Sequence, residues 1–342
     1  MLMISDDGLP ERVGDLEIVN RIGSRSISCV FHDIDGTHSR IRQWEPIMSR
    51  VLHTVIKDGI PAEMDSSQAV EQVSQMVGTE PLPETDRFCV ESAGLSAITQ
   101  MEWAIRRGIE EGTVKVDGTD FDDRSRRINT EVICGIWQGQ ETHDFEESES
   151  IKAFLKVHTP KLFLFYEQVL NHACRNRNLE LAATDPESWR IAGSLEFIRA
   201  LHQHGIKNYF VTGSVVQTDA QGKIAGGIYE EVLTLGFEIG AGQMVEAIFG
   251  SRWDQRMPKN EVIRNLCLQL DIDARNLLVI GDGRTEIKIG VDIGAVTISR
   301  LAPDADRLRD LHRELGTNYI MVDFLEASVS QLMPALYPNR DS

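Results

Sequence analysis

From residue 190 onward, short apolar runs alternate with longer segments in which apolar residues recur every three or four positions. The apolar runs predict β-strands at 206–214, 276–283, 294–300 and 318–324. The periodic segments predict helices at 188–204, 258–270 and 304–315. This alternation is typical of an α/β protein, and it predicts a parallel sheet with helices on both faces.

Residues 38–189 follow a different pattern, with long helical periods and little strand character. Helices are predicted at 44–56, 66–77, 94–112 and 151–176. We expect the last of these to be interrupted near Pro160, because proline removes a helical hydrogen bond. The segment 116–131 is polar and aperiodic, which indicates a loop.

The apolar run 27–32 precedes this helical stretch and predicts the first strand of the sheet. A helical insertion therefore separates the first strand from the second. We expect a doubly wound core formed by residues 1–37 and 190–342, and a mainly helical domain formed by residues 38–189. The length of 342 residues agrees with two domains of ordinary size.

Composition narrows the class of protein. A hydrophobic content of 42% with 26% charged residues is that of a soluble globular protein, and no apolar run approaches the roughly 20 residues of a membrane helix. Acidic residues near the start, in place of a basic and apolar leader, favour a cytoplasmic protein. Five scattered cysteines without a C-x-x-C pair argue against a disulfide framework and against a zinc site.

The net charge of −18 limits the partners further. It would repel the phosphate backbone of a nucleic acid, which argues against DNA or RNA as a partner. The same charge would repel a phosphorylated substrate. A site for such a substrate therefore needs a local cation inside an acidic molecule.

Two aspartates, Asp33 and Asp35, directly follow the first predicted strand, where their like charges would repel unless a cation or a shared proton separates them. Parallel sheets bind ligands at the carboxyl ends of their strands. The chain turns there, so Asp33 can point at a metal ion while Asp35 points elsewhere. An Asx-type turn that closes the strand is the alternative. A similar segment at 116–123 has no apolar run before it, and we interpret it as a loop.

The strand at 206–214 ends on Thr212, Gly213 and Ser214. Their hydroxyl and backbone N–H groups suit phosphate oxygens. The alternative is a common structural turn, because Thr and Ser at such turns usually cap helices.

Two further motifs follow. Lys259 comes directly after Pro258 at the start of a predicted helix, where a lysine on its own would be an exposed surface residue. The strand at 276–283 ends on Asp282 in a Gly-Asp-Gly turn, and Glu286 follows one helical turn later. Such a turn is common by itself, so each motif alone is a weak signal.

In this order and at these structural positions, the four motifs resemble those of the haloacid dehalogenase superfamily, chiefly its phosphatases. The likeness covers the strand that ends at Asp33 and most of 190–325. The insertion falls where that superfamily places its first-site cap domain. The chain is most similar to the phosphoglycolate-phosphatase-like branch, although its insertion is longer than is usual there. The resemblance implies a Rossmann-like core with a large helical cap.

The resemblance also implies a role for each motif. Asp33 would be the nucleophile that forms an aspartyl-phosphate, and Asp35 would be the general acid and then the base that activates water. Mg²⁺ would be held by Asp33, by the backbone carbonyl of Asp35 and by Asp282. Thr212 and Lys259 would hold the phosphoryl oxygens, and Lys259 would also offset the repulsion of the anionic substrate.

Five further residues have more than one interpretation or an open role. Glu286 stands where many members carry a second aspartate; it could reach the metal through water, orient the lysine, or be a solvent-facing helix carboxylate. Arg42 could pair with a second anionic group of the substrate, and a solvated linker arginine is the alternative. Trp103 with Arg106 and Arg107 could form a face of the cap.

We therefore expect a Mg²⁺-dependent phosphomonoester hydrolase that acts on a small phosphorylated metabolite, with a sugar or cyclitol phosphate as the favoured class. A phosphomutase or phosphotransferase of the same superfamily would use the same two aspartates. A non-catalytic regulatory protein is a third hypothesis, although a degenerate site should have lost at least one motif residue. The sequence identifies neither the substrate nor the oligomeric state.

Overall fold

The computed structural model describes residues 11–13, 16–23, 25–116, 121–140, 147–251 and 258–325. The chain forms two compact units. The core unit consists of Met1–Ile41 and Leu181–Ser342, and the helical unit consists of Arg42–Glu180. Among the described helices, none combines the length and the apolar character that crossing a membrane requires.

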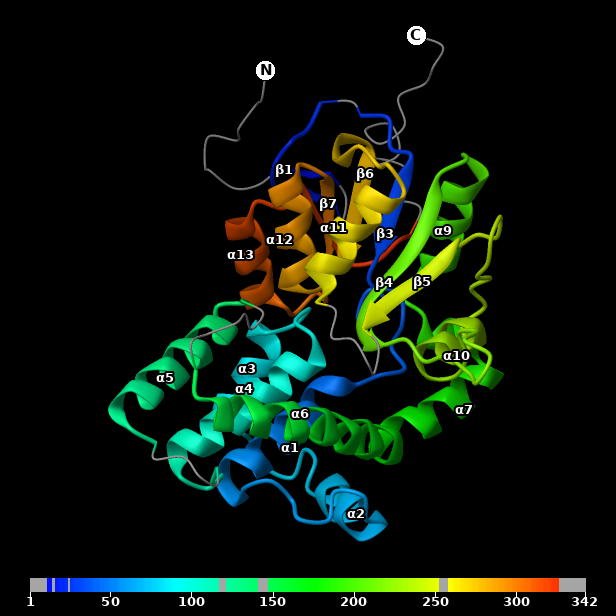
Figure 1. Cartoon of the computed structure of the whole chain (residues 1–342). Coiled ribbons are helices and arrows are strands. Elements are labelled where there is room, and N and C mark those ends of the chain that lie inside the picture. Colours follow the sequence, from blue (N-terminus) through cyan, green and yellow to red (C-terminus); the bar gives the residue numbers. More distant parts are fainter. Residues whose placement is uncertain are drawn as a thin grey trace. The chain divides into compact units, whose positions relative to one another are not determined.

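The core unit is built on one sheet with the strand order β1-β2-β8-β7-β6-β3-β4-β5 (Figure 1). Six strands run parallel: β3 (Cys29–His32), β4 (Lys207–Val215), β5 (Ala247–Ser251), β6 (Leu277–Gly281), β7 (Val296–Arg300) and β8 (Tyr319–Met321). The α/β class predicted from the sequence is confirmed. The hairpin of β1 (Glu11–Val13) and β2 (Leu16–Ile18) adds antiparallel strands at the β8 edge, and the sequence pattern did not predict it.

Helices cover both faces of this sheet. They are α8 (Pro186–Trp189), α9 (Ser194–Gln203), α10 (Gly227–Thr234), α11 (Lys259–Gln269), α12 (Arg284–Ile293) and α13 (Asp306–Leu315). Neighbouring residues of β3 face opposite sides: Phe31 packs in a cluster with Ile263 of α11, whereas the His32 ring lies 6.4 Å from the Phe197 ring of α9. Strands buried on both faces read as continuous apolar runs, which is why the sequence revealed β3, β6 and β7.

The helical unit contains all four helices that the periodicity predicted within residues 38–189. Its elements are α1 (Trp44–Asp58), α2 (Ser67–Gln75), α3 (Pro83–Glu91), α4 (Ala97–Glu111), α5 (Asp123–Trp137) and α6 (Glu149–Leu170). A π-helical turn, Asn171–Arg175, and α7 (Asn176–Thr184) follow α6. Three helices named here, α3, α5 and α7, were not predicted.

Two predictions for this unit are wrong. Helix α6 continues through Pro160, and the irregular turn lies at Asn171–Arg175 instead. Nine buried side chains anchor α6, and their packing outweighs the roughly 3 kcal/mol that an interior proline costs. The polar segment 116–131 is helical from Asp123, because the Asp122 carboxylate accepts a hydrogen bond from the Ser125 N–H and caps α5. Residues 117–120 lie outside the described part of the chain.

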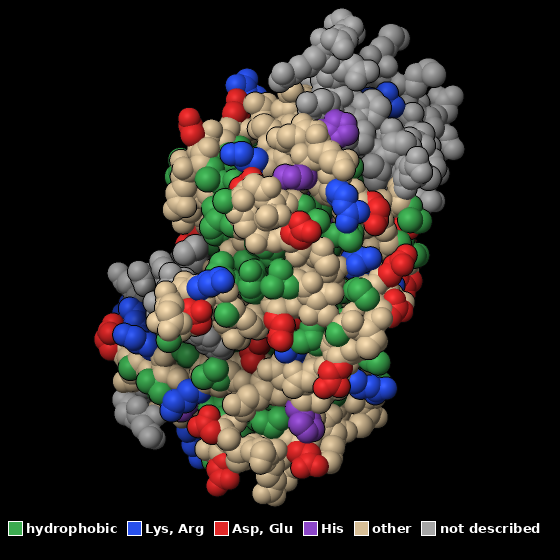
Figure 2. Space-filling view, turned by 90° about the vertical axis from the view of Figure 1, so that its right-hand side faces the viewer, with side chains coloured by type: hydrophobic (Ala, Val, Ile, Leu, Met, Phe, Trp, Pro, Cys, Tyr) green, Lys and Arg blue, Asp and Glu red, His purple; other side chains and the backbone are tan. Residues whose placement is uncertain are grey.

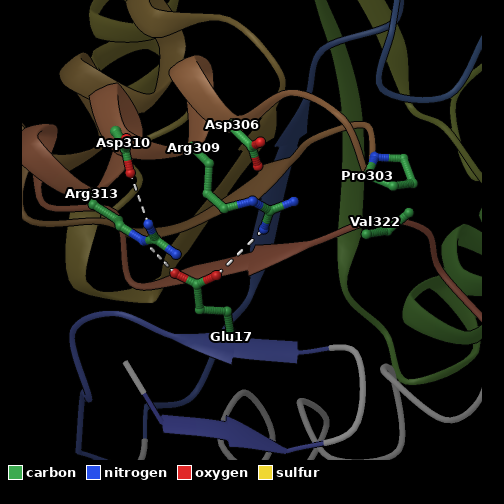
Figure 3. A pocket seen from close by; sticks show the side chains of 7 residues that line it. All are labelled: Glu17, Pro303, Asp306, Arg309, Asp310, Arg313 and Val322. Atoms are coloured by element: carbon green, nitrogen blue, oxygen red, sulfur yellow. Dashed lines mark hydrogen bonds and ion pairs between the residues drawn. The ribbon is translucent and has the colours of Figure 1, made fainter. Parts of the chain in front are cut away.

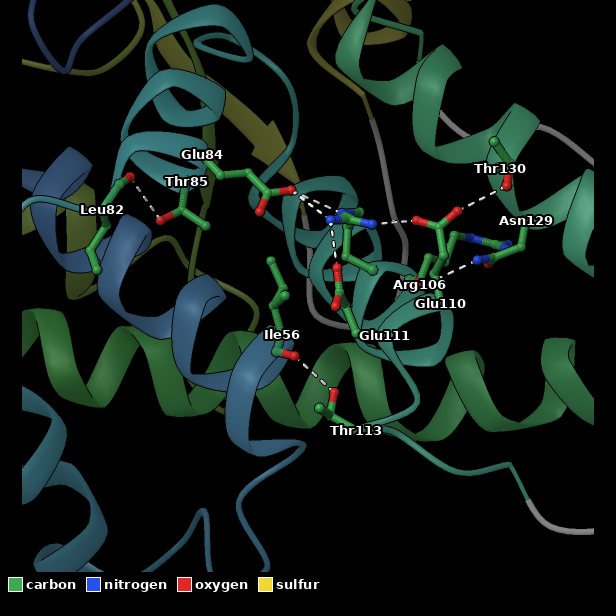
Figure 4. Close-up of polar contacts among 11 residues, drawn as sticks. Ile56, Leu82, Glu84, Thr85, Arg106, Glu110, Glu111, Thr113, Asn129 and Thr130 are labelled. Carbon is green, nitrogen blue, oxygen red and sulfur yellow. Dashed lines mark hydrogen bonds and ion pairs between the residues drawn. The ribbon is translucent and has the colours of Figure 1, made fainter.

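The expected cap face at Trp103 is also wrong. Trp103 is fully buried and stacks on Phe88, with ring centroids 3.7 Å apart. Arg106 is buried as well, and it forms an ion pair of 2.7 Å with Glu147. Figure 4 shows Arg106 and the polar contacts around α4, where the Arg107 guanidinium binds Glu84 at 2.9 Å. Arg106 thus pairs its charge inside the helical unit, whereas Arg107 is only partly buried.

On the face drawn in Figure 2, lysine and arginine side chains are interspersed with aspartate and glutamate. The whole chain has 53 acidic and 35 basic residues. A phosphorylated molecule would therefore meet mixed charge on this face, in an acidic protein overall.

A buried carboxylate ties the antiparallel hairpin to the core. Glu17 of β2 is 1% exposed; Arg313 Nε donates to its Oε1 at 2.7 Å, and Arg309 Nη1 donates to its Oε2 at 3.4 Å (Figure 3). These residues, with Pro303 and Val322, line a hollow of about 380 Å³. The two arginines of α13 thus compensate the charge that β2 buries.

Glu17→Gln should lower the free energy of unfolding by about 3 kcal/mol, because it leaves the largely buried guanidinium of Arg309 without the Glu17 carboxylate. Urea denaturation measures this change. Glu314→Gln removes an exposed carboxylate from the same helix and should stay within about 0.5 kcal/mol of the parent. Equal effects of the two variants would show that the ion pairs with Glu17 add nothing to stability.

Candidate active site

The sheet topology brings three motifs to one edge. Strand β3 lies between β4 and β6, and the Asp33 N–H extends the ladder by donating to the Ile280 carbonyl at 2.8 Å. Asp282 follows the end of β6, and Thr212 lies near the end of β4. Since parallel strands present their carboxyl ends together, these side chains meet at the same edge.

Lys259 supplies the cation at this edge. It is the first residue of α11, and its Nζ lies 2.6 Å from Asp33 Oδ1 and 3.2 Å from Glu286 Oε2. All three side chains are buried, with exposed fractions of 3%, 6% and 2%. The alternative of an exposed surface lysine at this position is therefore wrong, and Glu286 is not a solvent-facing carboxylate.

Three carboxylates form what we call the carboxylate cluster: Asp33, Asp282 and Glu286 each place an oxygen within 4.8 Å of the others. Burial and the neighbouring carboxylates raise the pKa of Asp282 well above its usual range. Burial also raises the pKa of Asp33, although Lys259 opposes this. For Lys259, burial favours the neutral amine, but Asp33 and Glu286 outweigh it and raise the pKa above its ordinary value.

This donor set fits a hard divalent cation. Carboxylate oxygens are the ligands that Mg²⁺ and Ca²⁺ take in proteins. Burial raises the pKa of Asp282 most, and the nearby Asp33 and Glu286 carboxylates raise it further; a cation among the three carboxylates would relieve their mutual repulsion. Which of the carboxylates would bind the metal directly stays a prediction.

The turn after Asp33 brings its backbone against Asp282. Thr37 Oγ1 lies 3.2 Å from Asp33 Oδ2 and 3.4 Å from Asp282 Oδ1, so one hydroxyl is shared between the two carboxylates. Gly36 has a φ of 75°, and a β-carbon there would lie only 1.9 Å from Asp282 Oδ2. Glycine is therefore required at this position both for its conformation and for its size.

Asp35 is not a member of the carboxylate cluster. Its side chain is half-buried. Ser214 Oγ donates to Asp35 Oδ2 at 3.4 Å. The two aspartates of the first motif thus have different surroundings, as the sequence suggested. The role of the Asp35 backbone carbonyl as a metal ligand remains a prediction.

The second motif lies beside the first. Strand β4 pairs with β3, with Phe210 opposite His32, so Thr212 lies next to the residues that follow β3. Thr212 is 1% exposed, and its hydroxyl accepts a hydrogen bond from the Ser214 N–H at 3.0 Å. Gly213 is half-buried. Phosphate binding by Thr212 and Gly213 stays a prediction.

Arg42 belongs to the helical unit. It is buried, and its Nη1 donates to Glu167 Oε1 at 3.2 Å. The alternative of a solvated linker arginine is therefore wrong. Its ion pair with a carboxylate that is only 14% exposed gives Arg42 a structural role, and its role toward a substrate stays a prediction.

Sequence reasoning missed two residues of the site. Thr37 follows Asp33 by four positions in the same motif, and that proximity was an available signal. Arg300, the last residue of β7, donates from Nη1 to the Gly36 carbonyl at 2.7 Å. No local pattern indicates this contact, because 264 residues separate the two.

Comparison with known proteins gives fold neighbours only. No protein-family model and no curated protein matches the chain. β-Phosphoglucomutase from Clostridium difficile is 12% identical with a TM-score of 0.46, and the match covers 91% of this chain and 97% of that one. A predicted phosphoglycolate phosphatase from Haemophilus somnus is 13% identical, with a TM-score of 0.42 and coverages of 90% and 98%. A phosphonoacetaldehyde hydrolase-like protein from Oleispira antarctica is 13% identical, with a TM-score of 0.46 and coverages of 93% and 95%.

The TM-scores lie below 0.5 and the identities at or below 13%, so the likeness adds no argument about chemistry. The activity inferred for this chain rests on its own residues.

Glu286→Gln should weaken metal binding or turnover by about 10–100-fold, the range typical of groups that orient metal-site residues. The physical reason is that Glu286 binds Lys259 and also accepts the Gly283 N–H at 2.7 Å, so its charge organises both. Asp282→Asn should cost more. Calorimetric titration with Mg²⁺ and steady-state rates measure both variants, and parent-like values in Glu286→Gln would contradict the prediction.

Proposed function

We propose that the chain is a Mg²⁺-dependent phosphomonoester hydrolase of the haloacid dehalogenase type. The observation that carries the proposal is the buried contact of 2.6 Å between Lys259 Nζ and Asp33 Oδ1, at the carboxyl edge of a parallel sheet and next to two further carboxylates. Such an arrangement gives an anionic nucleophile and a cation for the phosphoryl oxygens in one place.

Asp33 is the proposed nucleophile. One of its carboxylate oxygens attacks phosphorus, so a bond from Asp33 to phosphorus forms while the bond from phosphorus to the leaving alcohol breaks. The contacts with Lys259 and Thr37 hold the Asp33 carboxylate in one orientation. Preorganisation of this kind lowers the barrier because no side chain has to reorient during the reaction.

Asp35 is the proposed proton donor and acceptor. In the first step it gives its proton to the oxygen of the leaving alcohol, and in the second it takes a proton from the attacking water. Water then adds to phosphorus, the bond to Asp33 breaks, and inorganic phosphate leaves. The separation of Asp35 from the carboxylate cluster supports this division of labour, since an acid must not be fixed as a metal ligand.

Lys259 and the metal would compensate charge. When bound among the clustered carboxylates, Mg²⁺ would supply positive charge for the phosphoryl oxygens. Lys259 supports the same function from the protein side, because its ammonium stays protonated beside Asp33 and Glu286. Thr212 and the backbone of Gly213 complete the proposed phosphate site.

The proposed substrate is a small phosphorylated metabolite, with a sugar or cyclitol phosphate as the favoured class. This part rests on the resemblance, in which a helical cap excludes bulky substrates. A phosphomutase would transfer the phosphoryl group to a second hydroxyl instead of water. Release of inorganic phosphate from a panel of phosphate monoesters, without any sugar bisphosphate, distinguishes hydrolysis from transfer.

The metal requirement gives the first test. Activity should disappear after chelation with EDTA and return with Mg²⁺. Ca²⁺ should compete without supporting turnover, because its looser coordination of 6–8 oxygens misplaces the nucleophile. Phosphate release measured with each metal decides this, and full activity in EDTA would rule out the metal-dependent mechanism.

The two aspartates give the second test. Asp33→Asn should abolish reaction with every substrate, because no aspartyl-phosphate can form. Asp35→Asn should cost about 10²–10⁴-fold with an alkyl phosphate, whose alkoxide needs a proton to leave. With p-nitrophenyl phosphate the same variant should give a stoichiometric burst of nitrophenol, then slow turnover, since nitrophenolate leaves without help.

Rapid-quench measurement of the burst in both variants and in the parent separates these roles. Equal losses in both variants, with aryl and alkyl substrates alike and without a burst, would mean that the pair only holds the metal. The parent supplies the reference for both substrates.

A further inference from the structure

One buried arginine reaches the active-site turn from two strands away. Arg300 ends β7, and β6 lies between β7 and β3 in the sheet. Arg300 is only 8% exposed. Nη1 donates to the Gly36 carbonyl at 2.7 Å, and Nε donates to the Val322 carbonyl at 2.8 Å. The guanidinium therefore connects the segment after β8 to the turn after β3.

The peptide group between Gly36 and Thr37 is held at both ends. Arg300 donates to the carbonyl oxygen of this peptide, which belongs to Gly36. The N–H of the same peptide, which belongs to Thr37, donates to the Ile34 carbonyl at 3.2 Å. The N–H groups of the next two residues donate to the same Ile34 carbonyl, at 2.8 and 3.0 Å. Arg300 is thus the contact from outside that fixes the plane of a peptide inside a tight turn.

This peptide lies between the groups that the reaction would use. Asp35 directly precedes Gly36, and the Thr37 hydroxyl contacts Asp33 and Asp282. Asp33 has two further anchors, its N–H on the Ile280 carbonyl and its carboxylate on Lys259. The Asp35 carboxylate accepts a hydrogen bond from the Ser214 hydroxyl at 3.4 Å. A rotation of the peptide would displace Asp35 more than Asp33, because Asp35 directly precedes Gly36, whereas Asp33 is two residues further away and is held by Ile280 and Lys259.

We infer that Arg300 is a positioning residue, whose planar guanidinium fixes the turn at residues 34–39 and thereby the direction of the Asp35 carboxylate. The inference rests on the proposed function. Arginine suits this task because two of its N–H groups point in fixed, different directions, whereas a lysine ammonium is a single flexible point charge. The charge of Arg300 also lies near Asp282, so geometry and charge have to be tested separately.

Arg300→Lys keeps the charge and removes the two-directional contact. In this variant the turnover of an alkyl phosphate should fall by about 10–100-fold, the cost of a displacement of about 1 Å in a catalytic group. The first step on p-nitrophenyl phosphate, measured as the rapid-quench burst of nitrophenol, should stay within about threefold of the parent rate, because nitrophenolate leaves without a proton from Asp35. The measured quantity is the ratio of the alkyl-phosphate turnover to the rate of this aryl burst, called the alkyl-to-aryl ratio, and a general loss of stability would not change it.

Arg309→Lys is the matched control. Arg309 belongs to the same unit, is 9% exposed, and binds Glu17 rather than the turn. The Arg309→Lys variant should be less stable than the parent and should keep the parent's alkyl-to-aryl ratio. A second readout is independent of activity: amide hydrogen exchange of Thr37, His38 and Ser39 should become about tenfold faster or more in Arg300→Lys and stay parent-like in Arg309→Lys.

An alkyl-to-aryl ratio in Arg300→Lys equal to that of the parent would overturn the inference, whatever happens to the melting temperature. If the parent hydrolyses no phosphate ester, the proposed function fails on its own. The exchange rates of the turn then decide about Arg300: faster exchange supports its hold on the turn, and parent-like exchange overturns it.

Discussion

An ammonium group buried among carboxylates is the interaction on which this site depends. Lys259 contacts Asp33 and Glu286 within 3.2 Å, and all three are almost inaccessible to water. An isolated charge is costly to bury, and here the ammonium and the carboxylates compensate one another. The position of Lys259 is in turn fixed by hydrophobic packing, since α11 buries three apolar residues in the core: Val262, Ile263 and Leu266.

Much of the fold could be predicted because its strands are buried on both faces. Every residue of β6 is buried, and such a strand appears in the sequence as an unbroken apolar run. The hairpin of β1 and β2 could not be found in this way, since strands of three residues show no period. Its place depends on Glu17 and on Arg309, which lies 292 residues away. Pro160 misled the prediction because the packing of α6 outweighs a local preference.

The candidate site was predictable in its residue types and less so in its contacts. Carboxylates and a lysine at strand ends indicated the chemistry, because few other groups could compensate like charges there. Sequence could not show that Glu286 is buried, since a glutamate in a first helical turn is usually explained by the helix dipole. It could not show Arg300 either, because a contact with the Gly36 carbonyl leaves no pattern in the residues around it.

Under the proposed function, charge balance would let a protein with a net charge of −18 accommodate a phosphate. When ionised, the three clustered carboxylates and Lys259 together leave two negative charges, which is the charge that one divalent cation neutralises. An incoming phosphate would then meet a locally neutral site with its positive charges at fixed positions. Salt screens buried charges far less than exposed ones. The charges within the site would therefore act on a bound phosphate more strongly than the distant acidic residues of the surface. Under the proposed function the site would need no basic face, because Lys259 and a cation bound among the clustered carboxylates would supply the positive charge at the carboxyl edge of the sheet.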